Sequence, residues 1–248
     1  MNIKVFLIPV IALYIFTLSS IVQSQSRFEI SFHTGYSGPR YESYGTDVYI
    51  ANDLYTVTIG GKRLLVSDNL GMNYGFSFQL YGKYSFFRAG YLKAVFNVGF
   101  NQLEGKYSTP FGSDRYGVRM PVFSLGTGIE LNPIGMHKFY PSLIGLIRWN
   151  EIGGESFYHA GLDFFIVQPR FGYVYGFNLN YKLSQFIGLS AGTTFNYDNW
   201  LNKKTNDGTI DDPHAINFRD KASSTNGLTQ DRRIAYLSLL LGINFYLK

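Results

Sequence analysis

The sequence has no cysteine, few prolines and few charged residues. Its 248 residues include 8 Pro, and Asp, Glu, Lys and Arg together make up 16% of the chain, against about 25% in ordinary soluble domains. Without cysteine there is no disulfide framework, no thiolate metal site, no cysteine nucleophile and no acylated lipoprotein cysteine. So few charges cannot coat a water-facing surface of normal density. They also exclude intrinsic disorder, which requires high charge and low hydrophobicity.

The sequence also lacks basic clusters, and it has one segment that is typical of a targeting signal. The formal net charge of +5 is spread out, so we exclude nucleic acid as a partner. Lys4 precedes an apolar run at 5–18, and residues 22–24 fit the small-residue rule for cleavage. The run is shorter than the roughly 20 residues of a spanning helix. We therefore predict a secretory signal peptide at 1–24 and a single domain at 25–248.

Aromatic residues and alternating polarity dominate the remaining chain. Phe, Tyr and Trp make up 18% of the residues, and aromatic side chains favour strands. From Leu237 to Leu247 every second residue is apolar, which is the period of a strand with one apolar face. The same period predicts eight strands, at 28–37, 72–84, 89–102, 121–131, 138–150, 170–183, 186–197 and 236–248. The segment 138–150 is the least regular, because Ile144 and Leu146 fall on its polar parity, and we include it because its neighbours need a partner strand.

The two faces of these strands distinguish a membrane barrel from a soluble one. The apolar face carries no charge in any of the eight segments, as contact with lipid requires. The opposite face is mostly Gly, Ser, Asn and Thr, whereas a soluble lipocalin-like barrel would present Lys and Glu to water. Small residues suit the crowded interior of a narrow barrel. We therefore predict an all-β fold, a closed antiparallel up-and-down transmembrane β-barrel.

The connections between the strands alternate in length. The long ones are 39–70, 103–118, 151–168 and 199–232, and short turns separate them. Outer-membrane barrels have short periplasmic turns and long external loops, so we predict an outer-membrane location with both chain ends in the periplasm. Residues 55–66 indicate a hairpin with a Gly-Gly turn. We expect this hairpin to project above the membrane, and a wall of ten strands is the alternative.

These features resemble the small eight-stranded outer-membrane barrels of the OmpA-like and OmpX-like kind, over about residues 27–248. The resemblance rests on the alternating polarity of the strands, on the alternation of short and long connections, and on the final strand, which ends Ile243-Asn244-Phe245-Tyr246-Leu247-Lys248. Such barrels usually end on an aromatic residue, whereas here Leu247 and Lys248 follow the last one. The resemblance implies outer-membrane lipid, lipopolysaccharide and the barrel-insertion machinery of a Gram-negative envelope as partners. It leaves open a partner in a larger envelope complex, and cell-wall anchoring is not implied because no peptidoglycan-binding domain follows.

Ionisable residues on the inward-facing parity form the candidate site. Unpaired charges in a narrow interior are very costly, so we predict that these residues form one interior polar network. In it, each of the two acids that we expect to face inward is held by Lys or Arg. The network consists of Glu29, His33, Lys83, Lys93, Glu130, Arg148, Arg170 and Lys182.

Catalysis and metal binding have weaker support in the sequence. Glu29, Ser31 and His33 share one face of a strand, so a Ser-His-Glu set is conceivable, but any polar strand face shows such a trio. Loop 199–232 has acidic residues but not the spacing of a calcium loop, and its acids are balanced by Lys and Arg, so we interpret it as a solvated loop. We expect no enzyme activity, no metal and no cofactor. The predicted function is a non-enzymatic outer-membrane barrel with a structural or surface-binding role. A porin-like pore for small solutes is the alternative, and a lipid A-modifying enzyme is a third.

Overall fold

The computed structural model describes residues 27–44, 56–59, 62–65, 70–108, 115–158, 161–166, 169–201, 215–217 and 233–247. Within them the regular structure is β-strand, apart from one short 3-10 helix, η1 (Tyr41–Ser43). Among these residues, no helix has the length and hydropathy needed to cross a membrane. The predicted signal peptide at 1–24 lies outside the described residues and stays a prediction.

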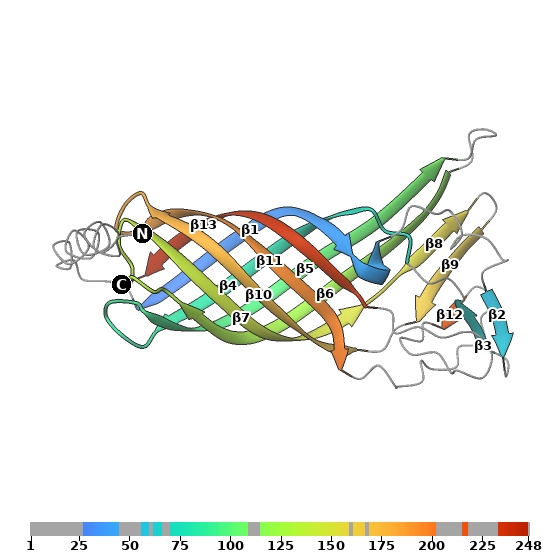
Figure 1. The fold of residues 1–248 in the computed structure, drawn as a ribbon, viewed down its shortest axis with the longest axis horizontal. Helices are drawn as coiled ribbons and strands as arrows, with labels where there is room; N and C mark the ends of the chain where they lie inside the picture. The colour runs from blue at the N-terminus through green and yellow to red at the C-terminus, as the bar shows by residue number, and fades with distance from the viewer. Residues whose placement is uncertain are drawn as a thin grey trace, which may run out of the picture.

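Eight antiparallel strands form a closed barrel wall (Figure 1). In order around the wall they are β1 (Phe28–Arg40), β4 (Tyr74–Ser85), β5 (Leu92–Ser108), β6 (Arg115–Leu131), β7 (Phe139–Ile152), β10 (Arg170–Lys182), β11 (Ile187–Leu201) and β13 (Ala235–Leu247). β13 pairs with β1 along its whole length and closes the wall. All eight strands expected from the alternation are present, and the predicted fold class is confirmed. Several strands run further toward the long loops than their sequence pattern indicated.

Five further strands lie beyond the wall, at its loop end (Figure 1). They are β2 (Thr56–Ile59), β3 (Lys62–Leu65), β8 (Glu155–Tyr158), β9 (Gly161–Ile166) and β12 (Ala215–Asn217). β8 pairs with β6, and the sheet continues outward in the order β8, β9, β12, β3, β2. β2 and β3 form the predicted hairpin and pair with each other outside the wall. The projecting hairpin is therefore confirmed, and the ten-stranded wall is wrong.

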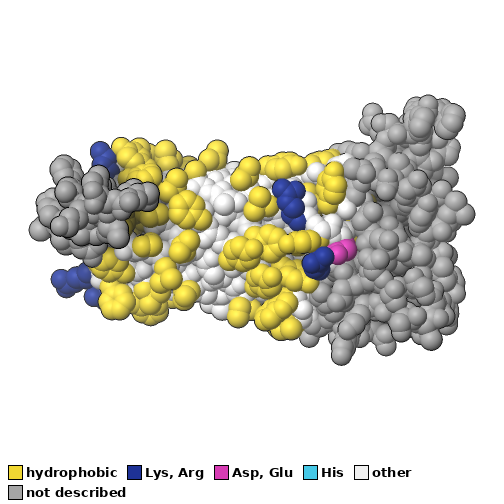
Figure 2. All heavy atoms as spheres, viewed as in Figure 1, with side chains coloured by type: hydrophobic (Ala, Val, Ile, Leu, Met, Phe, Trp, Pro, Cys, Tyr) yellow, Lys and Arg dark blue, Asp and Glu magenta, His cyan; other side chains and the backbone are white. Residues whose placement is uncertain are grey.

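The exterior of the wall is apolar. On the face that Figure 2 shows, hydrophobic side chains form two belts, separated by a band of backbone and side chains that are neither hydrophobic nor charged, with Lys and Arg near the ends. Phe78 is 53% exposed and Leu241 is 69% exposed. Soluble monomers rarely expose contiguous apolar patches larger than a few hundred Å², whereas the outer face of a membrane barrel must be apolar. The wall is thus built to contact lipid.

Exposed aromatic side chains mark the two ends of the wall. The short turns, the start of β1 and the end of β13 lie at one end, and β2, β3, β8, β9 and β12 lie beyond the other (Figure 1). Exposed aromatics at the turn end include Phe28, Phe86, Phe87, Tyr91, Phe139, Tyr181 and Phe186, and those at the loop end include Tyr36, Tyr41, Tyr44 and Trp200. Girdles of this kind lie at the two membrane–water interfaces of outer-membrane barrels.

Apolar layers fill parts of the lumen. One lies at the turn end and contains Met136, Tyr140 and Tyr246. A second consists of Tyr81, Val95, Ile144, Leu146 and Val174. A third lies at the loop end and consists of Leu70, Met72, Leu103, Val118, Met120, Val122, Ile152, Ile234 and Tyr236. The irregular pattern of segment 138–150 follows from this arrangement, because Ile144 and Leu146 are inward-facing members of the second layer.

Candidate functional site

Four charged residues from four neighbouring strands meet in the lumen near the turn end. Glu29 on β1, Lys83 on β4, Lys93 on β5 and Glu130 on β6 are each at most 4% exposed. The strand register brings them together, since Glu29 is opposite Lys83 and Lys93 is opposite Glu130. We call these four residues the Glu–Lys quartet.

Each carboxylate of the quartet contacts both ammonium groups. Lys83 Nζ lies 2.9 Å from Glu29 Oε1 and 2.7 Å from Glu130 Oε2. Lys93 Nζ lies 2.6 Å from Glu29 Oε2 and 2.9 Å from Glu130 Oε1. Ser31 adds a hydrogen bond of 2.9 Å from its hydroxyl to Glu29. The two positive and two negative charges cancel within one layer, which offsets the desolvation cost of burying them.

Two tyrosines and a lysine fill the lumen beside the quartet at the turn end. The hydroxyl groups of Tyr140 and Tyr246 are hydrogen-bonded at 3.2 Å. Lys182 is half-buried there, and its ammonium group donates to the carbonyl oxygen of Met136 at 3.2 Å. The same ammonium lies 5.1 Å from the ring centre of Tyr246, within the range of a cation–π contact. The structure thus places Lys182 against a ring and a carbonyl group.

His33 is bonded to a serine from another strand. Its Nε2 lies 3.0 Å from Ser190 Oγ on β11, and the centres of its ring and the Tyr81 ring are 5.1 Å apart in a T-shaped arrangement. The Ser-His-Glu set considered from the sequence does not form in that way, because Ser31 donates to Glu29 instead of engaging His33. Both His33 and Ser190 are buried in the lumen.

The two arginines of the predicted network lie elsewhere in the lumen. Arg148 donates from Nη2 to Gln79 Oε1 at 2.7 Å and from Nη1 to Asn196 Oδ1 at 3.0 Å. Arg170 is fully buried on β10, opposite Asn150 on β7. The lysines of the quartet therefore hold the two acids, and amide oxygens hold Arg148. This arrangement fixes Arg148 across the lumen between β4 and β11.

Sequence reasoning missed one inward-facing acid. Asp198 on β11 is fully buried, so the expectation that Glu29 and Glu130 are the only inward acids is wrong. Asn150 donates to the backbone carbonyl of Asp198 at 2.7 Å. The predicted strand ended at residue 197, whereas β11 continues to Leu201. Following the alternation one step further would have identified this residue.

A charged clamp ties the segment after β1 to the start of β13. Arg233 donates from Nε to Glu42 Oε2 and from Nη2 to Glu42 Oε1, each at 2.7 Å, in the bidentate geometry that favours Arg–carboxylate pairs. These hydrogen bonds hold the pKa of Glu42 below its ordinary value. The guanidinium group also lies 4.1 Å from the ring centre of Tyr41, and Ser43 donates to the carbonyl oxygen of Arg233 at 2.7 Å.

Comparison with known proteins identifies structural neighbours. No protein-family model matches the sequence, and no curated protein is significantly similar to it. Neisserial surface protein A is similar in structure, with 12% identity, a TM-score of 0.46, and coverage of 91% of this chain and 100% of that one. Ail, the attachment invasion locus protein of Yersinia pestis, shares 13% identity at a TM-score of 0.39, with coverage of 88% and 97%. The outer membrane protease OmpT from Escherichia coli shares 11% identity at a TM-score of 0.39, with coverage of 89% and 96%.

The identity of the fold rests on the chain's own geometry. Its eight antiparallel strands close on themselves, its exterior is apolar between two aromatic girdles, and its buried charges are paired in the lumen. A closed wall is what allows strands to cross a bilayer, because no backbone edge is left unpaired in lipid. This chain is an integral outer-membrane β-barrel protein of the small eight-stranded kind.

Proposed function

We propose that the protein is a closed, non-conducting barrel whose role is to hold a β-sheet extension outside the cell, for surface binding or for envelope structure. The observation that carries this proposal is the course of β6. Its residues 122–131 pair with β7 inside the wall, and its residues 117–119 pair with β8 beyond the wall. β6 therefore belongs both to the barrel wall and to the sheet extension beyond it.

The continuity of β6 supports a display role. β5 accompanies β6 along its whole length, as far as the pair Ser108 and Arg115, so the extension grows out of a two-stranded ribbon rooted in the barrel. Beyond it, β8, β9, β12, β3 and β2 continue the sheet. Binding residues commonly lie on segments that a rigid scaffold positions, and this wall provides such a scaffold.

The filled lumen supports the absence of conduction. Eight strands enclose an interior just wide enough for side chains, whereas open aqueous channels come with about 16–18 strands. Here three apolar layers alternate with the quartet and with Arg148, which bridges Gln79 and Asn196. A lumen filled by side chains favours a barrel that supports the external sheet over a barrel that acts as a channel.

The refolded protein is expected to give no sustained porin-sized current steps, because side chains occupy the lumen from end to end. Planar-bilayer recording measures this directly. A 16-stranded porin reconstituted under the same conditions is the positive control, and a gel shift on unboiled samples verifies that the barrel is closed. Sustained porin-sized steps would contradict the proposal and favour the pore.

Protease added to intact cells is expected to cut within 39–70 or 199–232, because those connections lie at the end that we assign to the cell exterior. The turns at 85–88 and 184–185 are expected to stay intact unless the outer membrane is permeabilised. Mass spectrometry of the fragments locates each cut. Cleavage at the two turns in intact cells would reverse the orientation of the barrel and remove the display role.

A further inference from the structure

We propose that the outer surface of β1 and β13 binds one phosphorylated glycolipid of the outer leaflet, with an acyl chain in a groove of the wall and a phosphate group on Arg40. The inference rests on the proposed orientation, which places the loop end in the outer leaflet. It deepens the expectation of lipopolysaccharide as a partner, because it names the residues that would select the lipid.

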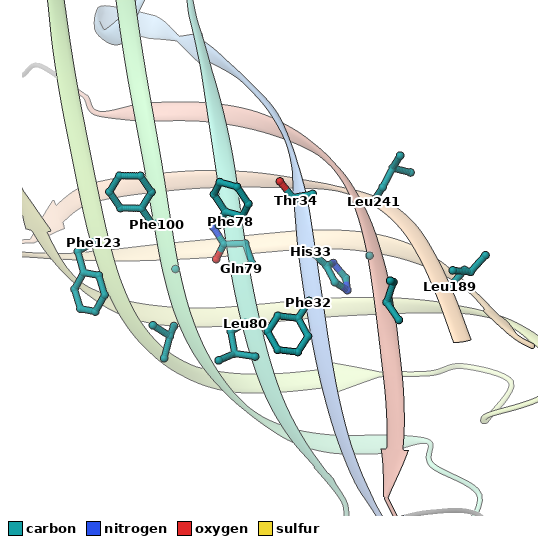
Figure 3. Close-up of a pocket in the computed structure, with 14 residues that line it drawn as sticks. Phe32, His33, Thr34, Phe78, Gln79, Leu80, Phe100, Phe123, Leu189 and Leu241 are labelled. Atoms are coloured by element: carbon teal, nitrogen blue, oxygen red, sulfur yellow. The ribbon is translucent and has the colours of Figure 1, made fainter. Parts of the chain in front are cut away.

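The wall has a hollow of about 660 Å³ on its exterior (Figure 3). Phe32 and Phe78 are among the large side chains around it, and at Gly242 the inner face of the wall is covered by the ring of His33. His33 reaches the hollow from the inner side, but its Nε2 is already bonded to Ser190. The hollow therefore offers apolar contact, which suits a hydrocarbon chain.

A second hollow of about 480 Å³ continues the first one toward the loop end, since Thr34 and Leu241 line both. We call it the β1–β13 groove, and its lining includes Thr34, Gly35 and Tyr36 on β1, Leu239 and Leu241 on β13, and Ala191 on the adjoining strand β11. The groove forms because outward-facing side chains of different size lie next to one another. Thr34 and Ala191 are small and point outward, whereas Leu239 and Leu241 beside them are 58% and 69% exposed.

Arg40 lies at the height where a lipid phosphate would meet this groove. It is on the same outward parity of β1 as Thr34, six residues further along the strand. At about 3.3 Å per residue this is about 20 Å along the strand, or about 15 Å along the membrane normal for a strand tilted by 35–45°. Half the hydrocarbon thickness of a bilayer is also about 15 Å. An acyl chain in the groove would thus have its headgroup near Arg40.

The guanidinium group of Arg40 is directed back toward the groove. A Cβ atom placed on Gly38 would lie 3.6 Å from Arg40 Nη1 and 3.5 Å from Tyr36 Cε1. Arg40 and Tyr36 therefore flank the same glycine just above the β1–β13 groove. Gly38 is buried between these two side chains, and an exposed tyrosine is typical of the level of the headgroups.

Arg40 differs from two other arginines, Arg233 and Arg119, in having no carboxylate partner among the described residues. Arg233 is held by Glu42 at 2.7 Å and Arg119 lies 3.4 Å from Glu104. In the part of the chain that the structure describes, no carboxylate is within ion-pair distance of Arg40, whose Nη1 donates to the carbonyl oxygen of Pro39 at 3.1 Å. A planar guanidinium group binds phosphate in a bidentate manner. The charge of Arg40 is thus available for an anionic headgroup.

Native mass spectrometry of the purified, folded barrel titrated with lipid A tests the proposal. The wild-type protein is expected to retain one lipid A molecule. Arg40→Gln should weaken this binding about fivefold, because an interfacial cation contributes about that factor. Ala191→Leu should weaken it by a similar factor by filling the groove, and its added side chain points into lipid.

Two variants serve as matched controls. Arg88→Gln removes an exposed cation at the turn end, and Gly145→Leu adds bulk on β7, where a Cβ atom would have nothing within 4 Å. Both should bind lipid A as the wild type does. A gel shift on unboiled samples verifies that all four variants fold.

Three results would overturn the proposal. The first is equal lipid A binding by wild type, Arg40→Gln and Ala191→Leu. The second is equal binding of lipid A after enzymatic removal of its phosphates. The third is equally tight binding of phosphatidylglycerol, which would assign the groove to phospholipid. Because binding in detergent does not depend on orientation, a failed display role would be recognised separately, in the protease experiment.

Discussion

Replacing Phe78 or Leu241 with arginine is expected to lower the free energy of unfolding by about 2–4 kcal/mol in a lipid bilayer, because each substitution places a charge near the membrane midplane. Both side chains are more than half exposed, and at such positions a water-soluble protein changes by no more than about 0.5 kcal/mol. The size of the effect thus separates a lipid-facing wall from a water-facing one. Denaturant titration of the barrel in phospholipid vesicles measures it.

The matched control is Phe28→Arg. Phe28 is as exposed as Phe78 but lies in the girdle at the turn end, where the cost of an arginine falls to about 0–1 kcal/mol. Because Phe28 and Phe78 are equally exposed, a difference in unfolding free energy between the two variants is due to their depth in the membrane. Equal tolerance of arginine at positions 28, 78 and 241 would contradict the membrane assignment.

Glu130→Ala is expected to destabilise the barrel by about 3–5 kcal/mol, which is the cost of removing one partner from a buried ion pair. Glu130 contacts Lys83 at 2.7 Å and Lys93 at 2.9 Å. Its removal leaves two buried ammonium groups facing the single carboxylate of Glu29. The same denaturant titration in vesicles provides the measurement.

A double variant separates charge imbalance from lost packing. In Lys83→Met with Glu130→Gln, one positive and one negative charge leave together, so the remaining pair of Lys93 and Glu29 stays neutral. We expect this variant to be more stable than Glu130→Ala alone, because replacing a whole buried ion pair is often close to neutral. If the double variant loses as much stability as the two single changes summed, the quartet is not a coupled unit.

Much of the wall could be predicted from the sequence, because each strand carries its own evidence. Period-two alternation shows which residues face lipid, and it indicates the strands one at a time, except for 138–150, which is included because its neighbours need a partner strand. The hairpin of β2 and β3 was also predictable, because its turn signal is local. For the same reason the parity of Glu29, Lys83, Lys93 and Glu130 was correct.

What could not be predicted depends on how strands are aligned with one another. The parity of Glu29 does not say which cation faces it; the register does, by setting Glu29 opposite Lys83. His33 and Ser190 are 157 residues apart in sequence, and nothing local links them. The β1–β13 groove likewise arises from differences in side-chain size across several strands, which no single strand pattern contains.

The pairing of β1 with β13 has a consequence for how the barrel is made. Phe28 pairs with Leu247 and Arg40 with Ala235, so the wall closes through contacts between the two ends of the domain. Contacts so distant in sequence form slowly, and until β13 is in place both β1 and β11 present unpaired backbone edges, which are templates for aggregation. Until its last strand arrives, an assembling chain therefore carries two sheet edges that are open to pairing with other chains.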